Sequence, residues 1–355
     1  MKTSVGGGKI CFLGSITHIL GMYNIRITEE YLLGLSTALQ FRFGYMSGAR
    51  IHGLLPSITC SDFSMDINMI NDTLSLYNVK MVCTTEKRQA DYVDTLKTYL
   101  KNNIPVMILI DVFNLPYYHE EKKHAARYIT CCKWRESEKK IEIVDTAYDT
   151  LHNRCFQGSI DEEVIFANDM SNLVIGHVYC MWHVIHLANM SIKEGWDTKK
   201  TFVKIPLMIH QKCYKVLFGD VISQYKVGYL GIQYLQEELL RCATSTQTPS
   251  GNDRFIQSLF EQMNSYTGPV VTRTLFYRFL VMVGSGKDIE TLLASANALR
   301  DKWENIGFLL MKSTYSENSK KLIGVCEQFN CVMEMESAMQ SLIKNRSPIN
   351  VVGVN

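Results

Sequence analysis

Apolar residues near the N-terminus recur at helical spacing. Leu13 and Ile16 share one face of the segment 10–23, which predicts a helix starting beside Cys11. A second, shorter helix is predicted after Thr28, a capping residue followed by two glutamates. This helix is expected to run towards FRFGYMSGAR.

The middle of the chain alternates between strand-like and helical segments. VKMVCTT reads as a strand, residues 91–102 place apolar side chains on one helical face, and IPVMILIDVF is apolar enough for a fully buried strand. RYITCCKW and KIEIVDTAY, joined by the charged turn RESEKK, predict a β-hairpin. Residues 161–171 are expected to be helical, and VIGHVYCMWHVIHL to form a strand that closes the sheet.

Long helical patterns dominate beyond about residue 189. The segments with three-to-four spacing are FVKIPLMIHQKCYKVLFGD, YLGIQYLQEELLRCA, FIQSLFEQMNSY, TRTLFYRFLVMVG, DIETLLASANALRDKWENIGFLLMK and KKLIGVCEQFNCVMEMESAMQSLIKN. The whole pattern predicts an α/β (α+β) domain over residues 1–187 and a helical domain over residues 188–355.

Composition narrows the class of protein. The chain has 355 residues, 46% of them hydrophobic and 20% charged, which suits a globular protein of two domains. A net charge of +2 gives no reason to expect a nucleic-acid or membrane partner. No apolar run reaches the length of a membrane-spanning helix, and the 11 cysteines form no disulfide-like framework. We therefore expect a cytoplasmic protein whose cysteines are mostly buried thiols.

One of these cysteines is placed where a thiol becomes reactive. The glycine run GGGK leads to Cys11 at the start of the first predicted helix. Unpaired N–H groups and the helix dipole stabilise negative charge there, so we expect a lowered pKa for this thiol. A lone cysteine among apolar residues is more often a small buried hydrophobe. His124 and Asp145 favour a nucleophile, because the predicted hairpin brings them onto adjacent strands.

Other candidate sites have plainer explanations. Four residues are spaced like metal ligands: His177, Cys180, His183 and His186. On a strand, residues three apart point to opposite faces, so they do not converge on one metal. GGGK lacks the spacing of a phosphate-binding loop. His18 lies two turns along the helix from Cys11, about 10 Å away, and is expected to be a core or cleft residue. No metal or cofactor is expected.

Several motifs follow one another in an informative order. A cysteine-initiated helix is followed by ITEE at 27–30, a leucine-glycine segment at 33–35 and FRFGY at 41–45. PVMILIDVFNLPYY, IEIVDTA, LFYRFLVMVG and ANALRDKWENIGFLL come later. In this order the chain resembles the family named for butirosin biosynthesis protein H, and the resemblance covers most of the chain.

The resemblance implies a papain-like cysteine peptidase fold followed by a helical domain. It further implies an acyltransferase of antibiotic biosynthesis, which moves an acyl group from an acyl carrier protein thioester to a small-molecule amine. Cys11 would be the nucleophile and Asp145 the orienting carboxylate. The position aligned with the general base holds Arg127, which cannot accept a proton. His124, three residues earlier, is the remaining candidate base, and His119 is a weaker substitute.

Two other classes of function stay open. A Cys/His/Asp site can also hydrolyse its acyl-enzyme, as a peptidase or amidohydrolase does. Alternatively, Arg127 favours a non-catalytic binding module whose site has lost its base. If catalysis occurs, the N–H groups of Lys9 and Cys11 are candidate oxyanion donors. An acidic carrier protein is expected to dock on paired cations. The nearest pairs in the sequence are Lys122, Lys123, Lys199 and Lys200.

Overall fold

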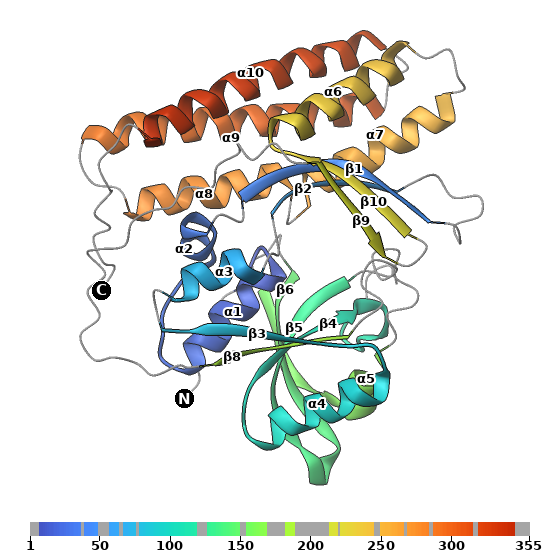
Figure 1. The fold of residues 1–355 in the computed structure, drawn as a ribbon, viewed down its shortest axis with the longest axis vertical. Coiled ribbons are helices and arrows are strands. Elements are labelled where there is room, and N and C mark those ends of the chain that lie inside the picture. Colours follow the sequence, from blue (N-terminus) through green and yellow to red (C-terminus); the bar gives the residue numbers. More distant parts are fainter. Residues whose placement is uncertain are drawn as a thin grey trace. The chain divides into compact units, whose positions relative to one another are not determined.

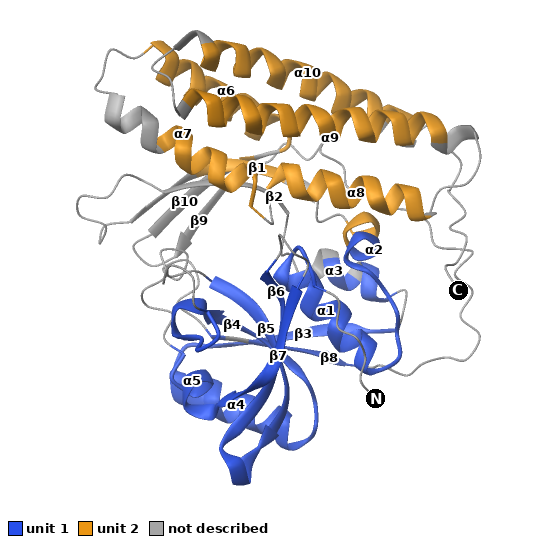
Figure 2. Ribbon diagram, turned by 180° about the vertical axis from the view of Figure 1, so that it is seen from behind, with its two compact units in different colours: residues 1–32, 67–194 blue, residues 33–66, 195–355 orange. Residues whose placement is uncertain are grey.

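The chain forms two compact units (Figure 2). The computed structural model describes residues 7–36, 39–48, 57–63, 67–75, 78–118, 126–149, 154–168, 182–188, 213–218, 221–244, 249–265, 268–283, 287–314 and 319–344. Unit 1 comprises Met1–Leu32 and Ile67–Glu194, and unit 2 comprises Leu33–Asp66 and Gly195–Asn355. The sequence placed one boundary between residues 187 and 188. The structure puts the corresponding boundary a few residues later and also assigns residues 33–66 to the second unit.

The first unit is built on a six-stranded sheet with the order β3-β8-β4-β5-β6-β7 (Figure 1). Its strands are β3 (Lys80–Glu86), β4 (Val106–Asp111), β5 (Ala126–Arg135), β6 (Lys140–Asp149), β7 (Arg154–Asp161) and β8 (Trp182–Ala188). Its helices are α1 (Cys11–Met22), α3 (Ile67–Leu74), α4 (Gln89–Lys101) and α5 (Glu162–Phe166), and α2 (Glu29–Leu35) begins in this unit. Neighbouring strands pair antiparallel throughout the described sheet. The predicted α+β class is confirmed, while the implied papain-like fold stays a prediction.

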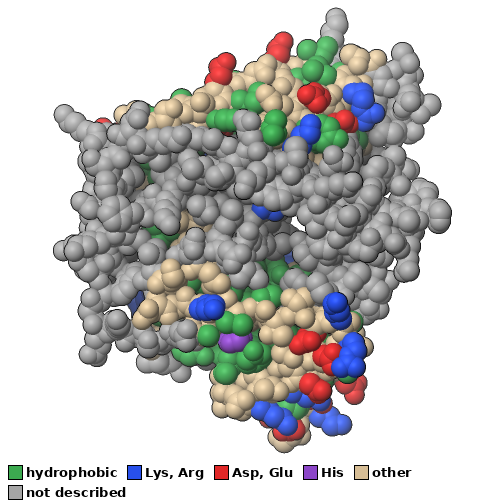
Figure 3. Space-filling model, in the orientation of Figure 1, with side chains coloured by type: hydrophobic (Ala, Val, Ile, Leu, Met, Phe, Trp, Pro, Cys, Tyr) green, Lys and Arg blue, Asp and Glu red, His purple; other side chains and the backbone are tan. Residues whose placement is uncertain are grey.

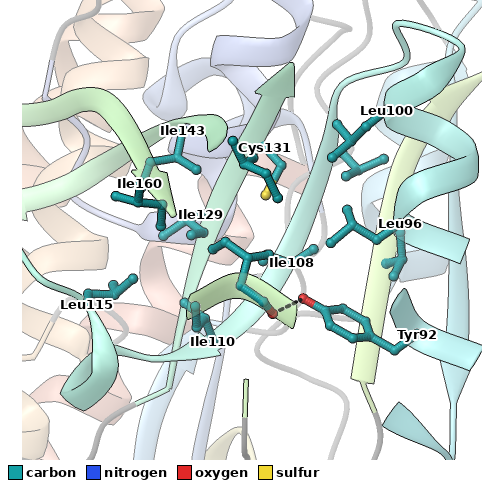
Figure 4. Packing of buried hydrophobic residues seen from close by; sticks show 14 of the residues in the cluster. Tyr92, Leu96, Leu100, Ile108, Ile110, Leu115, Ile129, Cys131, Ile143 and Ile160 are labelled. Carbon is teal, nitrogen blue, oxygen red and sulfur yellow. Dashed lines mark hydrogen bonds between the residues drawn. The ribbon is translucent and has the colours of Figure 1, made fainter. Parts of the chain in front are cut away.

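Side chains alternate along β5 and fix which helix covers which face of the sheet. The ring of Tyr128 meets that of Phe12 on α1 edge-on, with centroids 5.0 Å apart. The next residue, Ile129, lies in a buried cluster with Tyr92 and Leu96 of α4 (Figure 4). Because successive strand residues point to opposite faces, α1 and α4 cover opposite faces of the sheet. The predicted hairpin is therefore held from both sides.

Three features of the first unit differ from what the sequence predicted. β8 lies between β3 and β4 instead of closing the sheet at an edge. β7 was not predicted, because most of its side chains are exposed or half-exposed and give no apolar pattern. The helix expected over residues 161–171 is only Glu162–Phe166, and residues 169–171 lie outside the described ranges.

Charged side chains of both signs gather around the β5–β6 turn, near the bottom of Figure 3. Arg135 pairs with Glu138 at 3.4 Å and also with Glu142, and Lys101 pairs with Glu136 at 3.5 Å. Exposed pairs of this kind add little stability. Because the two signs alternate here, the turn presents no field of one sign to a charged partner.

The second unit combines a four-stranded antiparallel sheet, in the order β2-β1-β10-β9, with helices. The strands are β1 (Leu39–Gly48), β2 (Ser57–Phe63), β9 (Cys213–Phe218) and β10 (Val221–Val227). The helices are α6 (Tyr229–Thr244), α7 (Pro249–Met263), α8 (Pro269–Val283), α9 (Lys287–Thr314) and α10 (Ser319–Lys344). The helical C-terminal region is thus confirmed. None of the described helices combines the length and apolar character needed to cross a membrane.

The sequence predicted helices, and no sheet, for the second unit. Cys213–Phe218 was expected to be helical, yet it forms β9 and pairs with β10. The FRFGYM segment received no strand prediction, although Phe41 and Phe43 are both fully buried two residues apart, as one face of a strand requires. Phe41 stacks on Trp303 of α9 at 5.4 Å between ring centroids, which joins the sheet to the helices.

Candidate active site around Cys11

α1 begins at Cys11, as predicted. Ile10 precedes it in an extended conformation and offers no side-chain cap to the helix. From Phe12 to Ile16 the helix is buried, whereas Cys11 itself is partly exposed. The first residue of α1 therefore lies where the helix leaves the core, while its sulfur is largely removed from water.

The β5–β6 hairpin meets this end of α1. The main chain of Tyr128 hydrogen-bonds the Cys11 thiol, and the charges of Arg127 and Asp145 act on the same thiol. Gly8, just before the helix, donates its N–H to the carbonyl oxygen of Thr146 at 2.5 Å. Cys11 and Asp145 therefore belong to one site.

The pKa of the Cys11 thiol is raised, whereas the sequence predicted that it would be lowered. Burial raises the pKa of the Cys11 thiol above its ordinary value, and it outweighs the Tyr128 hydrogen bond and the Arg127 charge, which both lower it. The carboxylates of Asp145 and Glu29 also raise this pKa. The N–H groups and the dipole at the helix start favour a thiolate, but removal of water from the sulfur is the larger effect. Cys11 is a protonated thiol at neutral pH and needs a base to become a nucleophile.

Arg127 occupies the centre of the site. Its Nη1 lies 3.2 Å from Asp145 Oδ2 and donates to the Ala147 carbonyl at 2.7 Å, while Nη2 donates to the Tyr118 hydroxyl at 2.9 Å. Both members of the ion pair are buried, Arg127 with 5% and Asp145 with 0% of its surface exposed. Arg127, at the position where the resemblance leads us to expect a general base, is thus a guanidinium bound to the Asp145 carboxylate.

Asp145 has further partners. Its Oδ1 accepts the N–H of Ala147 at 3.1 Å, and its Oδ2 accepts the Tyr117 hydroxyl at 3.4 Å. Burial raises the pKa of Asp145, and Arg127 opposes the rise. Tyr117 and Tyr118 were not predicted as site residues; the sequence signal for them was the NLPYY run after β4.

His124, the predicted base, lies outside the described residues. So do His119 and the four lysines of the predicted docking surface. A role for Asp145 in orienting His124 therefore stays a prediction. His18, expected in the core or a cleft, is placed with its Nε2 3.6 Å from Cys132 Sγ, and burial lowers the pKa of His18.

The backbone N–H of Lys9, one of the two predicted oxyanion donors, is already hydrogen-bonded within the protein. Lys9 donates its backbone N–H to Glu29 Oε2 at 2.7 Å, so it does not point to a substrate oxygen. The sequence could not show this, because Glu29 lies 20 residues further along the chain, in α2. Of the zinc-like run, His177 and Cys180 lie outside the described residues. Within the described ranges, no group of three or more His, Cys, Asp or Glu side chains is placed to hold a metal ion.

The fold and this site define an α+β domain in which a helix-initiating cysteine faces a hairpin with a buried carboxylate. Residues 11–146 match the family model described as "Butirosin biosynthesis protein H, N-terminal", and this part of the chain is a domain of that family. The match begins at Cys11 and ends directly after Asp145, so the two ends of the family domain meet at the site. No curated protein matches the chain.

Proposed function

We propose that this protein is a cysteine-dependent acyltransferase that forms an amide. Its substrates would be the thioester of an acyl carrier protein and a small-molecule amine. The observation that supports this is the placement of Cys11, partly exposed at the start of α1 and under the charges of Arg127 and Asp145. The family, named for a protein of butirosin biosynthesis, makes natural-product assembly the expected setting.

The proposed reaction has two halves. The Cys11 sulfur attacks the thioester carbonyl, a base takes the thiol proton, and the carrier thiol leaves with a proton, giving an acyl-enzyme. The amine then attacks the acyl-enzyme, an amide leaves, and the Cys11 thiol is restored. Because the pKa of Cys11 is raised, the first half requires a base, for which His124 is the candidate. The Arg127 guanidinium would stabilise the sulfur as it gains negative charge.

A second candidate function is a binding module without catalysis. Arg127 favours it, because the guanidinium already holds the carboxylate that a histidine base would need. Under this hypothesis the domain binds an acyl carrier without forming an acyl-enzyme. Two variants separate the hypotheses. If Arg127→His raises activity while His124→Ala has no effect, position 127 is the place of a base that this protein lacks, and His124 does not replace it.

One incubation distinguishes the outcomes. The protein is mixed with an acyl carrier thioester and an amine, and the products are followed by mass spectrometry. An amide supports the acyltransferase, a free acid indicates a hydrolase, and neither product supports the binding module. Intact-mass measurement should show an acyl adduct that is lost in Cys11→Ala. The adduct should be retained in the control Cys83→Ala, which removes a different, partly exposed thiol on β3. Normal turnover by Cys11→Ala would show that the amine attacks the carrier thioester directly.

A further inference from the structure

A carboxylate holds the chain just before the nucleophile. Glu29, the first residue of α2, is buried with 8% of its surface exposed. Its Oε2 accepts the N–H of Lys9 at 2.7 Å, and its Oε1 accepts the N–H of Ile10 at 3.3 Å. In a capping box a glutamate of the same helix takes the corresponding N–H. Here the carboxylate comes from a different helix and fastens residues 8–10, which we call the approach segment.

Two glycines make room for this carboxylate. A Cβ on Gly8 would come within 2.5 Å of Glu29 Oε1, and a Cβ on Gly14 within 2.8 Å of the same oxygen. The approach segment is also fixed from the other side, because Gly8 donates its N–H to Thr146 of β6. It is therefore held between α2 and the strand that carries Asp145, and Cys11 is the next residue along the chain.

We propose that Glu29 is a positioning residue of the Cys11 site, which sets the placement of the thiol by holding the approach segment. The inference depends on the proposed role of Cys11 as nucleophile. A reacting sulfur must lie within about 3.5 Å of the thioester carbon, and a displacement of about 1 Å costs on the order of 100-fold in rate. A carboxylate with two acceptor oxygens holds both N–H groups, whereas an amide at the same place presents only one acceptor.

Because Glu29 can be ionised or protonated, its hold on the approach segment depends on pH. Burial raises the pKa of Glu29 to about 7; Glu30 of the same helix adds to the rise, and the main-chain N–H groups and the charge of Lys9 oppose it. Ionised Glu29 in turn raises the pKa of Cys11. Above pH 7 the carboxylate therefore accepts both N–H groups, and below pH 7 protonation weakens one of the two bonds. The thiol is thus best placed when Glu29 is ionised, although that charge makes the thiol harder to ionise.

Glu29→Gln separates these two effects. Without the negative charge, the pKa of Cys11 should fall, and alkylation of Cys11 by iodoacetamide near neutral pH should become several-fold faster. Acyl transfer should become slower by about 10- to 100-fold in kcat, because the thiol is less well placed. The rise in transfer rate around pH 7 should also disappear. Glu163→Gln is the matched control, since this glutamate of α5 is exposed and belongs to the same unit, and it should change either rate by less than about two-fold.

Alkylation is read by peptide mass spectrometry, so that each cysteine reports separately. The fully buried Cys131 should stay unmodified, which shows that the variant is folded. If Glu29→Gln keeps the wild-type transfer rate and Cys11 pH profile while Cys131 stays protected, the proposal is overturned. If Cys131 reacts, the Glu29→Gln variant is not folded, and Gly8→Ala is tested in its place. The methyl group added at residue 8 displaces the Glu29 carboxylate without removing that carboxylate. Wild-type transfer by Gly8→Ala would likewise overturn the proposal.

The proposed function can fail separately. Should the wild-type protein transfer no acyl group, the acyltransferase is excluded, and the alkylation profile alone decides whether Glu29 is coupled to Cys11. An unchanged Cys11 profile in Glu29→Gln would then refute the coupling as well.

Discussion

Replacing Arg127 with methionine should reveal how far the site depends on its buried ion pair. The substitution keeps most of the side-chain volume but leaves Asp145, with 0% of its surface exposed, without a cation. It also removes the donors to the Ala147 carbonyl and the Tyr118 hydroxyl. Breaking a buried pair by removing one partner costs about 3–5 kcal/mol, and we expect this loss in the free energy of unfolding at pH 7.

The loss should shrink as the solution becomes more acidic. Burial already raises the pKa of Asp145, and removing Arg127 takes away the charge that lowers it. A carboxyl whose folded pKa lies above its unfolded pKa stabilises the fold most at low pH and loses that contribution as pH rises through the folded pKa. As pH falls from the folded pKa of Asp145 towards the lower pKa of the unfolded chain, each pH unit should therefore return up to about 1.4 kcal/mol of the loss.

Urea denaturation followed by circular dichroism measures the loss, and hydrogen exchange of β5 and β6 localises it to the first unit. Arg154→Met is the matched control, since this arginine pairs with Asp149 on the next hairpin and its side chain is 65% exposed. It should cost no more than about 1 kcal/mol. The double variant Arg127→Met/Asp145→Asn should lose less than the sum of the single losses. A loss for Arg127→Met that equals the control, or one that does not change with pH, would refute the reasoning.

Three further predictions concern the base, the partner and the packing of α1. His124→Ala should slow acylation in a stopped-flow assay by about 10²–10⁴-fold without unfolding the protein, and an unchanged rate would remove it from the mechanism. Reversing Lys122 and Lys123 to glutamate should weaken binding of an acidic carrier protein in calorimetry, more strongly at low salt; equal affinities would place the docking face elsewhere. Gly14→Ala should cost about 1–3 kcal/mol in thermal melts, because its Cβ would meet Thr146 first and then Glu29, whereas Gly21→Ala, with open space around it, should gain about 0.5 kcal/mol.

Much of the first unit could be predicted because its elements have strong local patterns. α1 and α4 have a clear helical period, and the six residues of β4 are all buried, as an uninterrupted apolar run indicates. The hairpin was predictable because both arms favour strands and the turn is charged. That prediction placed His124 and Asp145 on adjacent strands; the pairing of Asp145 with Arg127 was not predicted.

What could not be predicted depends on contacts between distant residues. Nothing near Glu29 in the sequence shows that its carboxylate reaches Lys9 and Ile10. The direction of the Cys11 pKa shift depends on how much water is removed from the sulfur, which no local pattern encodes. The strand at Phe41 was missed for another reason. A short apolar run can satisfy a helical or an extended period equally well until its partner strand is known.

The assignment of residues 33–66 to the second unit has a consequence for the order in which the chain can fold. β1 pairs on one side with β2 and on the other with β10, from Arg42↔Val227 to Gly48↔Val221. During synthesis the β1–β2 ribbon therefore emerges long before the strand that covers its open edge. Such an edge can associate with other chains until it is paired. A fragment ending with the family domain at residue 146 would keep that edge uncovered and would also lack β7 and β8 of the first sheet.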